Sequence, residues 1–350
     1  MANRFDLLRL MAALAVFAAH GDFLYRLHLP VPFAGHSLGS LAVYVFFFIS
    51  GYLVSQSWTR QPRWGAFWVK RLVRIFPGLV VAVVFSVAVI GWAATTLPTQ
   101  QYWSAPGTWL NLANNAVALA TVQTLPGVFE SNPFARAVNG SLWTIRYELA
   151  MYAVLAVLGQ MFKGRRWVYP AMAAGLMVLW WAARVGSWDA ALEERGGLAA
   201  DVFRWHDFCG FGVPFFVGST FAAYGVRARP WMVAAALLAA LVALFADSPA
   251  LIQVAVWALV TCGMHYAAFA GSVGLHGSGR GRIDLSYGVY IYAFPIQQAV
   301  TELSLRQGWS LATCMSLALV LVLVMAWCSW HLVERPSIFL GQRYIKKYSC

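Results

Sequence analysis

The sequence predicts an all-α integral membrane protein, a polytopic bundle of about ten transmembrane helices. Of its 350 residues, 61% are hydrophobic and only 11% are charged, whereas a soluble globular domain is about 25% charged. The mean hydropathy is +0.64. Apolar runs near the roughly 18 residues that a membrane-crossing helix needs recur along the whole chain. We therefore expect one membrane domain over residues 1–350, without a separate soluble domain.

The expected helices are the apolar runs that lie between loop signals. They cover residues 5–26, 37–57, 76–97, 141–162, 167–185, 209–225, 231–246, 250–271, 284–304 and 310–333. The first run carries Asp6, Arg9 and His20 and has no small-residue cleavage site after it, so it predicts a retained helix rather than a signal peptide. The two runs at 209–225 and 231–246 are short, and tilted or re-entrant segments are the alternative there.

The basic residues predict the orientation. Most of the 25 Lys and Arg residues lie in alternate loops, and the positive-inside rule places those loops and both termini in the cytoplasm. The net charge of +12 is spread over short loops rather than one soluble face, so we expect the lipid bilayer and no nucleic acid as partner. The five cysteines have no paired spacing, and no disulfide framework or metal site is expected. The oligomeric state stays open.

The longest connection, residues 98–140, predicts an extracytoplasmic lid. It is too apolar for a flexible linker, so we expect it to pack over the membrane domain. Aromatic and amide side chains suited to a glycan are available here and farther along the chain, although interfacial belts explain most of the Trp residues. They are Trp103, Trp109, Asn111, Gln297 and Gln298.

The first helix carries two polar residues that are costly in a bilayer. Arg9 and His20 are eleven positions apart, which places them within about 20° of one face and roughly 16 Å apart along the axis. An intramembrane Arg costs about 2.5–3.5 kcal/mol on the insertion scale and usually marks a polar path. The alternative is that Asp6 neutralises Arg9 and that His20 caps a helix end.

The fourth helix is expected to open with the sequence Ser-Leu-Trp-Thr-Ile-Arg-Tyr-Glu, residues 141–148. Helical spacing puts Ser141, Glu148 and Tyr152 on one stripe, with Glu148 about two turns inside the membrane. A buried carboxylate without a local partner should find one on another helix or bind a proton, which makes Glu148 a functional candidate. A structural Glu bonded to a neighbouring helix is the alternative.

Three cations, Lys70, Arg71 and Arg74, are expected in the inner loop that follows the second helix. Cations at a membrane entrance suit phosphate groups. The alternative is that these residues only fix the orientation or bind anionic lipid head groups.

Taken in order, these motifs resemble the membrane acyltransferase-3 family nearly from end to end. The resemblance rests on Asp-Leu-Leu-Arg at 6–9 with His20, Phe-Phe-Ile-Ser-Gly-Tyr at 47–52, Lys-Arg-Leu-Val-Arg-Ile-Phe-Pro at 70–77, the motif at 141–148 with Tyr152, Ser-Tyr-Gly-Val-Tyr-Ile-Tyr at 286–292, and Glu-Arg-Pro at 334–336. Many relatives have an Asp and a His where this chain has Tyr44 and Ala293, so roles assigned to those groups do not carry over.

The resemblance implies a bacterial inner-membrane enzyme that moves an acyl group, commonly acetyl, from cytosolic acyl-coenzyme A to an extracytoplasmic glycan. It implies that Arg9 and His20 form the signature pair and that Glu148 is the fourth-helix carboxylate. It also implies that Arg71 and Arg74 form the cytoplasmic basic motif, which favours docking of the coenzyme A phosphates there.

The resulting hypothesis assigns catalysis to His20, Glu148 and Arg9. His20 acts as general base on a sugar hydroxyl or, alternatively, carries the acyl group itself. Glu148 orients or charge-stabilises the imidazole, and Arg9 contacts the pantetheine arm or a phosphate.

Lys70 joins the two arginines of the basic motif in binding the donor, and three residues are substrate-side candidates, namely Ser141, Tyr152 and Tyr290. Ser141 is a less favoured acyl carrier. The alternative function is a transporter with an intramembrane Arg, His and Glu pathway and a helix broken at Pro295. A repeat-built transporter should show matching interrupted helices in two halves, and the sequence shows no internal repeat.

Overall fold

The computed structural model describes residues 4–25, 27, 31, 33, 35–195, 203–270 and 283–348. The described part is helical, with three isolated β-bridges as its extended pairings. The prediction of an all-α polytopic membrane protein is confirmed. The chain divides into two compact units, which are described separately below. Unit 1 is Met1–Ala15, Pro30–Trp64 and Tyr147–Arg282, and unit 2 is Val16–Leu29, Gly65–Arg146 and Ile283–Cys350.

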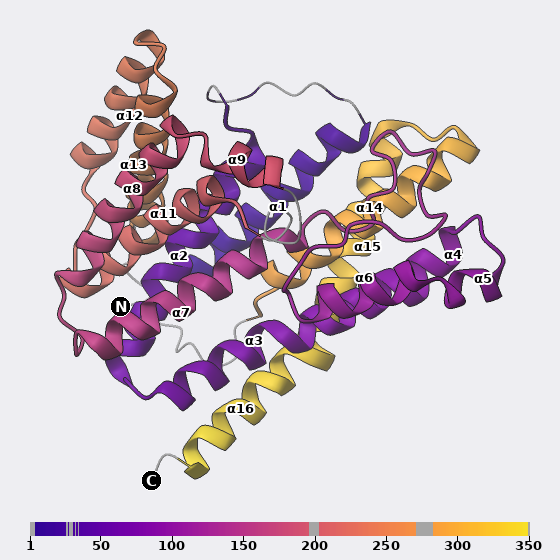
Figure 1. The fold of residues 1–350 in the computed structure, drawn as a ribbon, viewed down its shortest axis with the longest axis horizontal. Helices are drawn as coiled ribbons and strands as arrows, with labels where there is room; N and C mark the ends of the chain where they lie inside the picture. Colours follow the sequence, from indigo (N-terminus) through magenta and orange to yellow (C-terminus); the bar gives the residue numbers. More distant parts are fainter. Residues whose placement is uncertain are drawn as a thin grey trace. The chain divides into compact units, whose positions relative to one another are not determined.

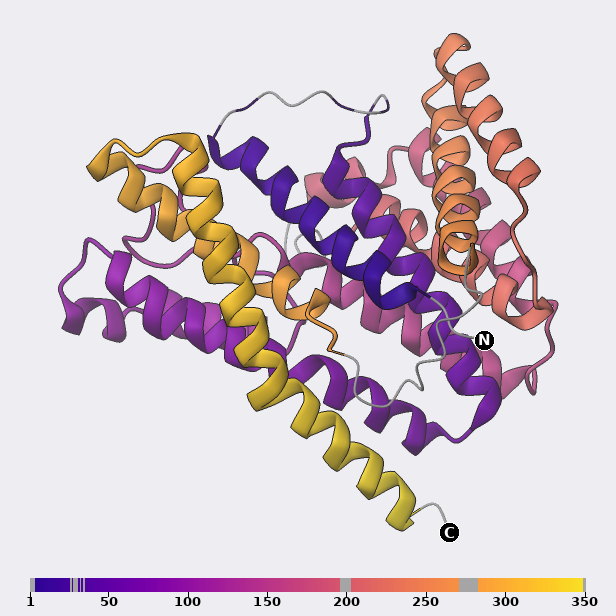
Figure 2. The same cartoon turned by 180° about the vertical axis from the view of Figure 1, so that it is seen from behind.

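Figures 1 and 2 show the helices from two opposite sides. The boundary between the units divides α1 (Phe5–Tyr25) and α7 (Ile145–Met161), and it separates Trp64, the first residue of α3 (Trp64–Val84), from the rest of that helix. Unit 1 also contains α2 (Leu38–Arg60), α8 (Val168–Val185), α9 (Trp188–Arg195), α11 (Trp205–Tyr224), α12 (Pro230–Phe245) and α13 (Pro249–Phe269). Unit 2 also contains almost all of α3 (Trp64–Val84), then η1 (Phe85–Gly91), α4 (Trp92–Ala94), α5 (Thr99–Ser104), α6 (Pro106–Ala116), η2 (Leu142–Thr144), α14 (Ser286–Gln307), α15 (Leu311–Ser329), η3 (Trp330–Glu334) and α16 (Arg335–Tyr348).

Seven helices within the described residues are long and apolar enough to cross a membrane. They are Phe5–Tyr25, Leu38–Arg60, Trp64–Ala94, Leu142–Met161, Val168–Val185, Pro249–Phe269 and Leu311–Tyr348. The other three expected spans are also helices, α11, α12 and α14, but α12 has 16 residues and the other two are less apolar. The expected count of about ten is therefore not confirmed.

The third helix begins earlier than expected, so the expected inner loop at residues 70–74 is wrong. α3 starts at Trp64 and includes Pro77, and the helical path continues through the π-helix η1 to Ala94. A proline is tolerated inside a membrane helix because local adjustments satisfy the backbone group it frees. Lys70, Arg71 and Arg74 therefore lie on a helix, which fixes their spacing.

The last helix extends past the expected end at residue 333. α15 passes through the π-helix η3 into α16, and Figure 2 shows this path as one long helix that leads to the C-terminus. Gly341 of α16 lies against α3, since a Cβ at this position would be 2.8 Å from a methyl carbon of Val73. The C-terminal helix thus packs along the helix that carries the basic residues.

Helices α2 and α11 approach closely in unit 1. A Cβ on Gly51 would be 1.8 Å from the carbonyl oxygen of Phe215, and one on Gly218 would be 2.2 Å from that of Phe48. Two glycines on facing helices therefore allow backbone-to-backbone contact, the packing typical of membrane helices. This contact places Ser50, which precedes Gly51, at a fixed depth in unit 1.

The expected lid, residues 98–140, is ordered by its own polar side chains. The amide of Asn111 donates to the carbonyl oxygens of Val122 and Thr124 at 2.7 and 3.0 Å, and Asn115 also donates to Val122. These buried amides therefore bond to the segment itself. Tyr102 is fully buried and donates to the carbonyl oxygen of Val87 at 2.8 Å.

Candidate functional site

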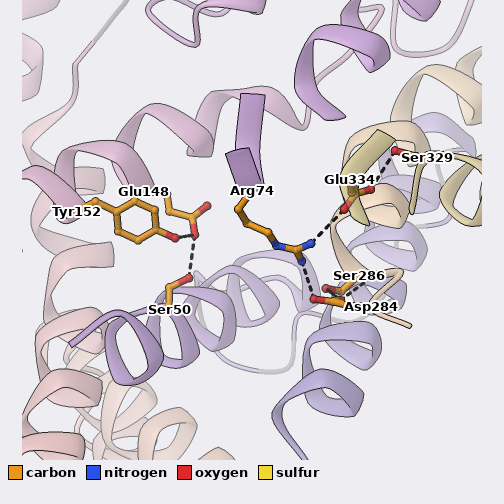
Figure 3. Close-up of polar contacts among 8 residues, drawn as sticks. All are labelled: Ser50, Arg74, Glu148, Tyr152, Asp284, Ser286, Ser329 and Glu334. Carbon is orange, nitrogen blue, oxygen red and sulfur yellow. Dashed lines mark hydrogen bonds and ion pairs between the residues drawn. The ribbon is translucent and has the colours of Figure 1, made fainter. Parts of the chain in front are cut away.

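Glu148 is held by two hydroxyl donors in unit 1 (Figure 3). The Ser50 hydroxyl donates to Glu148 Oε1 at 2.8 Å, and the Tyr152 hydroxyl donates to the same oxygen. Tyr152 lies one helical turn after Glu148, so the expectation that this carboxylate lacks a local partner was wrong. The predicted stripe that joins Glu148 and Tyr152 is confirmed. Two charge-assisted hydrogen bonds fix the orientation of the carboxylate.

The start of the fourth expected helix differs in local form from the expectation. A 3₁₀ turn at Leu142–Thr144 precedes the helix, which begins at Ile145 and has Glu148 in its first turn. The candidate membrane span begins at Leu142, so Glu148 lies about two turns after the start of that span. A negative charge in the first turn is favourable because the helix dipole is positive there. The same 3₁₀ turn removes Ser141 from the helix and from the stripe that holds Glu148.

Arg74 is held between two carboxylates in unit 2 (Figure 3). Its Nη2 donates to Asp284 Oδ2 at 2.6 Å and its Nη1 donates to Glu334 Oε2 at 3.2 Å. The Glu334 side chain is fully buried, and the side chains of Arg74 and Asp284 are 19% and 12% exposed. A buried carboxylate needs such a cation and further hydrogen bonds. The ion triad of Arg74, Asp284 and Glu334 links α3, the residues just before α14, and the π-helix η3.

The π-helix η3 explains how Glu334 reaches this position. The Ser329 hydroxyl donates to Glu334 Oε1 at 2.9 Å, five residues along the chain. In an α-helix, residues five apart are separated by about 140° around the axis, whereas the wider π turn brings them onto one face. Gly78 on α3 provides space for the Glu334 side chain, because a Cβ at position 78 would be 3.3 Å from Glu334 Cγ. Asp284 and Glu334 were not predicted as partners of Arg74, although the Glu-Arg-Pro motif at 334–336 contains Glu334.

Lys70 and Arg71 lie one turn before Arg74 on α3, and both are half-buried. The Arg71 guanidinium carbon lies 5.9 Å from the centroid of the Phe67 ring, at cation–π distance. The aromatic ring restricts the side chain near the N-terminal end of α3. This part of α3 therefore presents a positively charged surface on a rigid element.

His20 packs against α14 within unit 2. Its ring lies 5.0 Å from the Phe294 ring in an edge-on arrangement of 81°, and the Gln297 side chain is its polar neighbour. Nδ1 of His20 is buried and has no hydrogen-bond partner among the described residues. A buried imidazole nitrogen without a partner is a candidate for contact with substrate.

Ser141 and Tyr290 also lie in unit 2. The Tyr290 hydroxyl is 2.7 Å from the Thr144 hydroxyl, and the backbone N–H of Ser141 donates to Asn139 Oδ1. The Asn139 amide in turn donates to the carbonyl oxygen of Ile291 on α14. Ser141 Oγ is buried, and no described residue forms a hydrogen bond with it. The segment before α7 is therefore fixed against α14 with one hydroxyl left for another group.

Arg9 lies on α1, half-buried, in the part of that helix that belongs to unit 1. The expected break at Pro295 is wrong, because α14 continues from Ser286 to Gln307 through this proline. Gln297 and Gln298 are fully buried in α14 rather than exposed at an outer mouth. The interrupted helix that the transporter hypothesis used is therefore absent from α14.

Comparisons with known proteins give one family. A family model described as an acyltransferase domain matches residues 3–333. The chain is 30% identical over 338 residues to a protein named O-acetyl transferase of Shigella phage Sf6, with 95% of both chains covered. It is 34% identical over 200 residues to Nodulation protein 10 of Rhizobium leguminosarum bv. viciae. The matched region covers 54% of this chain and 51% of that relative. No solved structure matches.

Proposed function

This chain belongs to the membrane acyltransferase-3 family, and from that premise we propose that it moves an acetyl group from cytoplasmic acyl-coenzyme A to a hydroxyl of an extracytoplasmic glycan. The observation that carries the proposal is the match to an O-acetyl transferase over 95% of both chains. Membership of an acyltransferase family favours an enzyme over a transporter. The relatives come from a phage and a bacterium, which supports a bacterial inner membrane as the location.

The donor end of the proposed site is the basic stretch of α3. Acyl-coenzyme A carries several phosphate charges, and cations on a rigid helix hold such groups well. We assign this contact to Lys70 and Arg71, with Arg9 on the pantetheine arm or a phosphate. The Arg74 donors already point at Asp284 and Glu334, so Arg74 holds the helix that carries Arg71.

The chemistry is an acyl transfer from sulfur to oxygen. The glycan hydroxyl oxygen forms a bond to the thioester carbonyl carbon, and the bond from that carbon to sulfur breaks. The hydroxyl proton passes to His20 and then to the departing thiolate, which leaves as the free thiol. Imidazole suits this role because its ordinary pKa lies near neutral pH.

The acceptor end uses the remaining candidates. The Glu148 carboxylate, with Oε1 fixed by Ser50 and Tyr152, offers a charged acceptor to substrate hydroxyl groups. The Ser141 hydroxyl offers a donor that no group in the described ranges of the chain uses. Tyr290 is bonded to Thr144 and supports the Ser141 segment.

The test uses purified protein in detergent with radiolabelled acetyl-coenzyme A and a panel of glycans. The variants are His20→Ala and Arg71→Ala, and the matched controls are His206→Ala and Arg343→Ala, which change an imidazole and an arginine that are substantially exposed.

We expect transfer in the wild type and in both controls. His20→Ala should lose about 10²–10⁴-fold in kcat, the usual contribution of a general base, whereas Arg71→Ala should raise the KM for acetyl-coenzyme A. A wild-type protein that neither binds nor consumes acetyl-coenzyme A would contradict the proposed donor, and full activity of His20→Ala would contradict the proposed base.

A further inference from the structure

Two consecutive glutamines on α14, Gln297 and Gln298, are both fully buried, but their amides are used differently. Gln298 donates to the carbonyl oxygens of Phe134 and Ala137 at 2.8 and 2.6 Å, and its Oε1 accepts from Asn132 at 2.8 Å. Gln297 donates to the carbonyl oxygen of Phe17 at 3.0 Å, while its Oε1 has no hydrogen-bond partner among the residues that the structure describes. Leaving a buried polar atom unbonded costs about 1–3 kcal/mol, so this oxygen calls for an explanation.

The position of the Gln297 amide suggests its use. Phe17 lies three residues before His20 on α1, so the bond to its carbonyl oxygen holds the amide one turn from the imidazole. The Gln297 side chain is next to the His20 ring, and Phe294, one turn earlier on α14, packs edge-on against that ring at 5.0 Å. α14 therefore presents an aromatic ring and an amide oxygen to a single histidine.

The His20 ring and the Gln297 amide each have a buried polar atom that lacks a hydrogen-bond partner among the described residues. Within the described part of the chain, Nδ1 of His20 is buried and has no hydrogen-bond partner, and the same holds for Oε1 of Gln297. Catalytic hydrogen bonds are often long or poorly aligned without substrate and tighten when it binds. A bound substrate hydroxyl would form a hydrogen bond with one nitrogen of the His20 ring. The N–H of the other ring nitrogen would then need a hydrogen-bond acceptor.

We propose that Gln297 is a positioning residue for His20. Its Oε1 accepts the N–H of one ring nitrogen, so the other nitrogen is presented to the substrate in the form that can take a proton. This inference rests on the proposed function and assigns to an uncharged amide the orienting role that a carboxylate has in other histidine-dependent acyl transferases.

The proton balance follows from this geometry. As the glycan oxygen bonds to the acyl carbon, its proton moves to the substrate-facing nitrogen and the ring becomes positively charged. The N–H on the opposite nitrogen remains in place and is stabilised by Gln297 Oε1. When the carbon–sulfur bond breaks, the same proton moves from the ring to the thiolate, and the imidazole returns to its starting tautomer.

Gln297→Met and Gln298→Met form a matched pair, because methionine is close to glutamine in size and has no amide. For Gln297→Met we expect kcat to fall about 10–100-fold, part of the general-base contribution, with the KM for acetyl-coenzyme A unchanged within about twofold. Gln298→Met removes all three hydrogen bonds named above. It should lower Tm more than Gln297→Met does, while kcat per folded enzyme stays near that of the wild type.

A second measurement reads the histidine directly and does not depend on turnover. Protein with ¹⁵N-labelled histidine is reconstituted in lipid, and the His20 signals are assigned by their loss in His20→Gln. We expect one imidazole tautomer in the wild type and in Gln298→Met. Gln297→Met should show a mixture of the two tautomers.

The outcomes separate the two claims. If His20→Ala is inactive but Gln297→Met keeps wild-type kcat and a single tautomer, the positioning role is wrong and the proposed function stands. If both glutamine variants lose kcat in proportion to their loss of Tm, the role of Gln297 is structural only. If His20→Ala is fully active, the proposed function is wrong in assigning the general base to His20.

Discussion

Arg74 and Glu334 are 260 residues apart in the sequence and form an ion pair in which the Glu334 carboxylate is fully buried. The pair connects α3 to the π-helix η3, and Asp284 at the N-terminal end of α14 completes the triad. Arg71 lies on α3 as well, one turn before Arg74. The geometry of the proposed donor site therefore depends on an ion triad that does not itself need to touch the donor.

Removal of Arg74 should destabilise unit 2. Arg74→Ala leaves Glu334 buried without its cation, and breaking a buried pair in this way typically costs about 3–5 kcal/mol. Because Arg74 is 19% exposed, we expect the lower end of that range. Thermal unfolding in detergent measures the change, and the double variant Arg74→Met with Glu334→Leu should recover part of the lost Tm. An unchanged Tm in Arg74→Ala would show that the triad does not stabilise the fold.

Ser50→Ala should reduce activity through Glu148. The variant removes one of the two donors to Oε1, and a hydrogen bond to a charged group contributes about 1.5–3 kcal/mol. Ser55→Ala is the matched control on α2, because the Ser55 hydroxyl bonds to the Tyr52 carbonyl oxygen of its own helix. The comparison of kcat/KM for the two variants is the measurement. Equal effects would argue against a functional role for the Glu148 contact.

Gly51→Ala should prevent correct assembly of α2 and α11. The new Cβ would lie 1.8 Å from the Phe215 carbonyl oxygen, a clash with backbone that no side-chain rotation relieves. Overpacking of this kind costs at least about 1–3 kcal/mol. Fluorescence-detected gel filtration should show loss of the folded peak, while Gly263→Ala, whose Cβ meets nothing within 4 Å, should keep it. A normal Gly51→Ala profile would contradict the close helix approach.

Tyr102 gives the protein a pH-dependent stability at high pH. Burial raises the pKa of Tyr102 to about 12 from the ordinary value of 10.0. The folded state therefore holds this proton more tightly than the unfolded state, and the stabilisation is complete below pH 10 and decreases as the pH rises towards 12. The full effect is about 2–3 kcal/mol, since one pKa unit corresponds to about 1.4 kcal/mol. Chemical unfolding measures the free energy of unfolding of the wild type and of Tyr102→Phe between pH 9 and 12. The two values should approach each other as the pH rises, and a constant difference between them would contradict the raised pKa.

The sequence predicted the positions of the helices better than their ends. Hydropathy located every run, because a bilayer requires long apolar segments. It placed the start of the third helix near residue 76 and the end of the last at 333, because the charges at Lys70, Arg71 and Glu334 were assigned to loops. In the structure these charges are on helices, where the triad and the half-buried surroundings accommodate them.

The candidate site was partly predictable for a similar reason. The spacing of Glu148 and Tyr152 is local, so helical periodicity placed them together. The bonds of Arg74 to Asp284 and Glu334 cross more than 200 residues, and a single sequence has no periodicity that reports such contacts. The proposed positioning role of Gln297 could not be predicted from the sequence, because only the hydrogen bonds of the folded chain distinguish Gln297 from Gln298.

The most direct test of the central claim is acyl transfer across a bilayer. The protein is reconstituted in sealed vesicles that contain a glycan acceptor, and radiolabelled acetyl-coenzyme A is supplied outside. We expect label on the enclosed glycan with the wild type and none above background with His20→Ala. Labelled glycan in vesicles with His20→Ala, or no label with a folded wild-type protein and an acceptor that it acetylates in detergent, would contradict this claim.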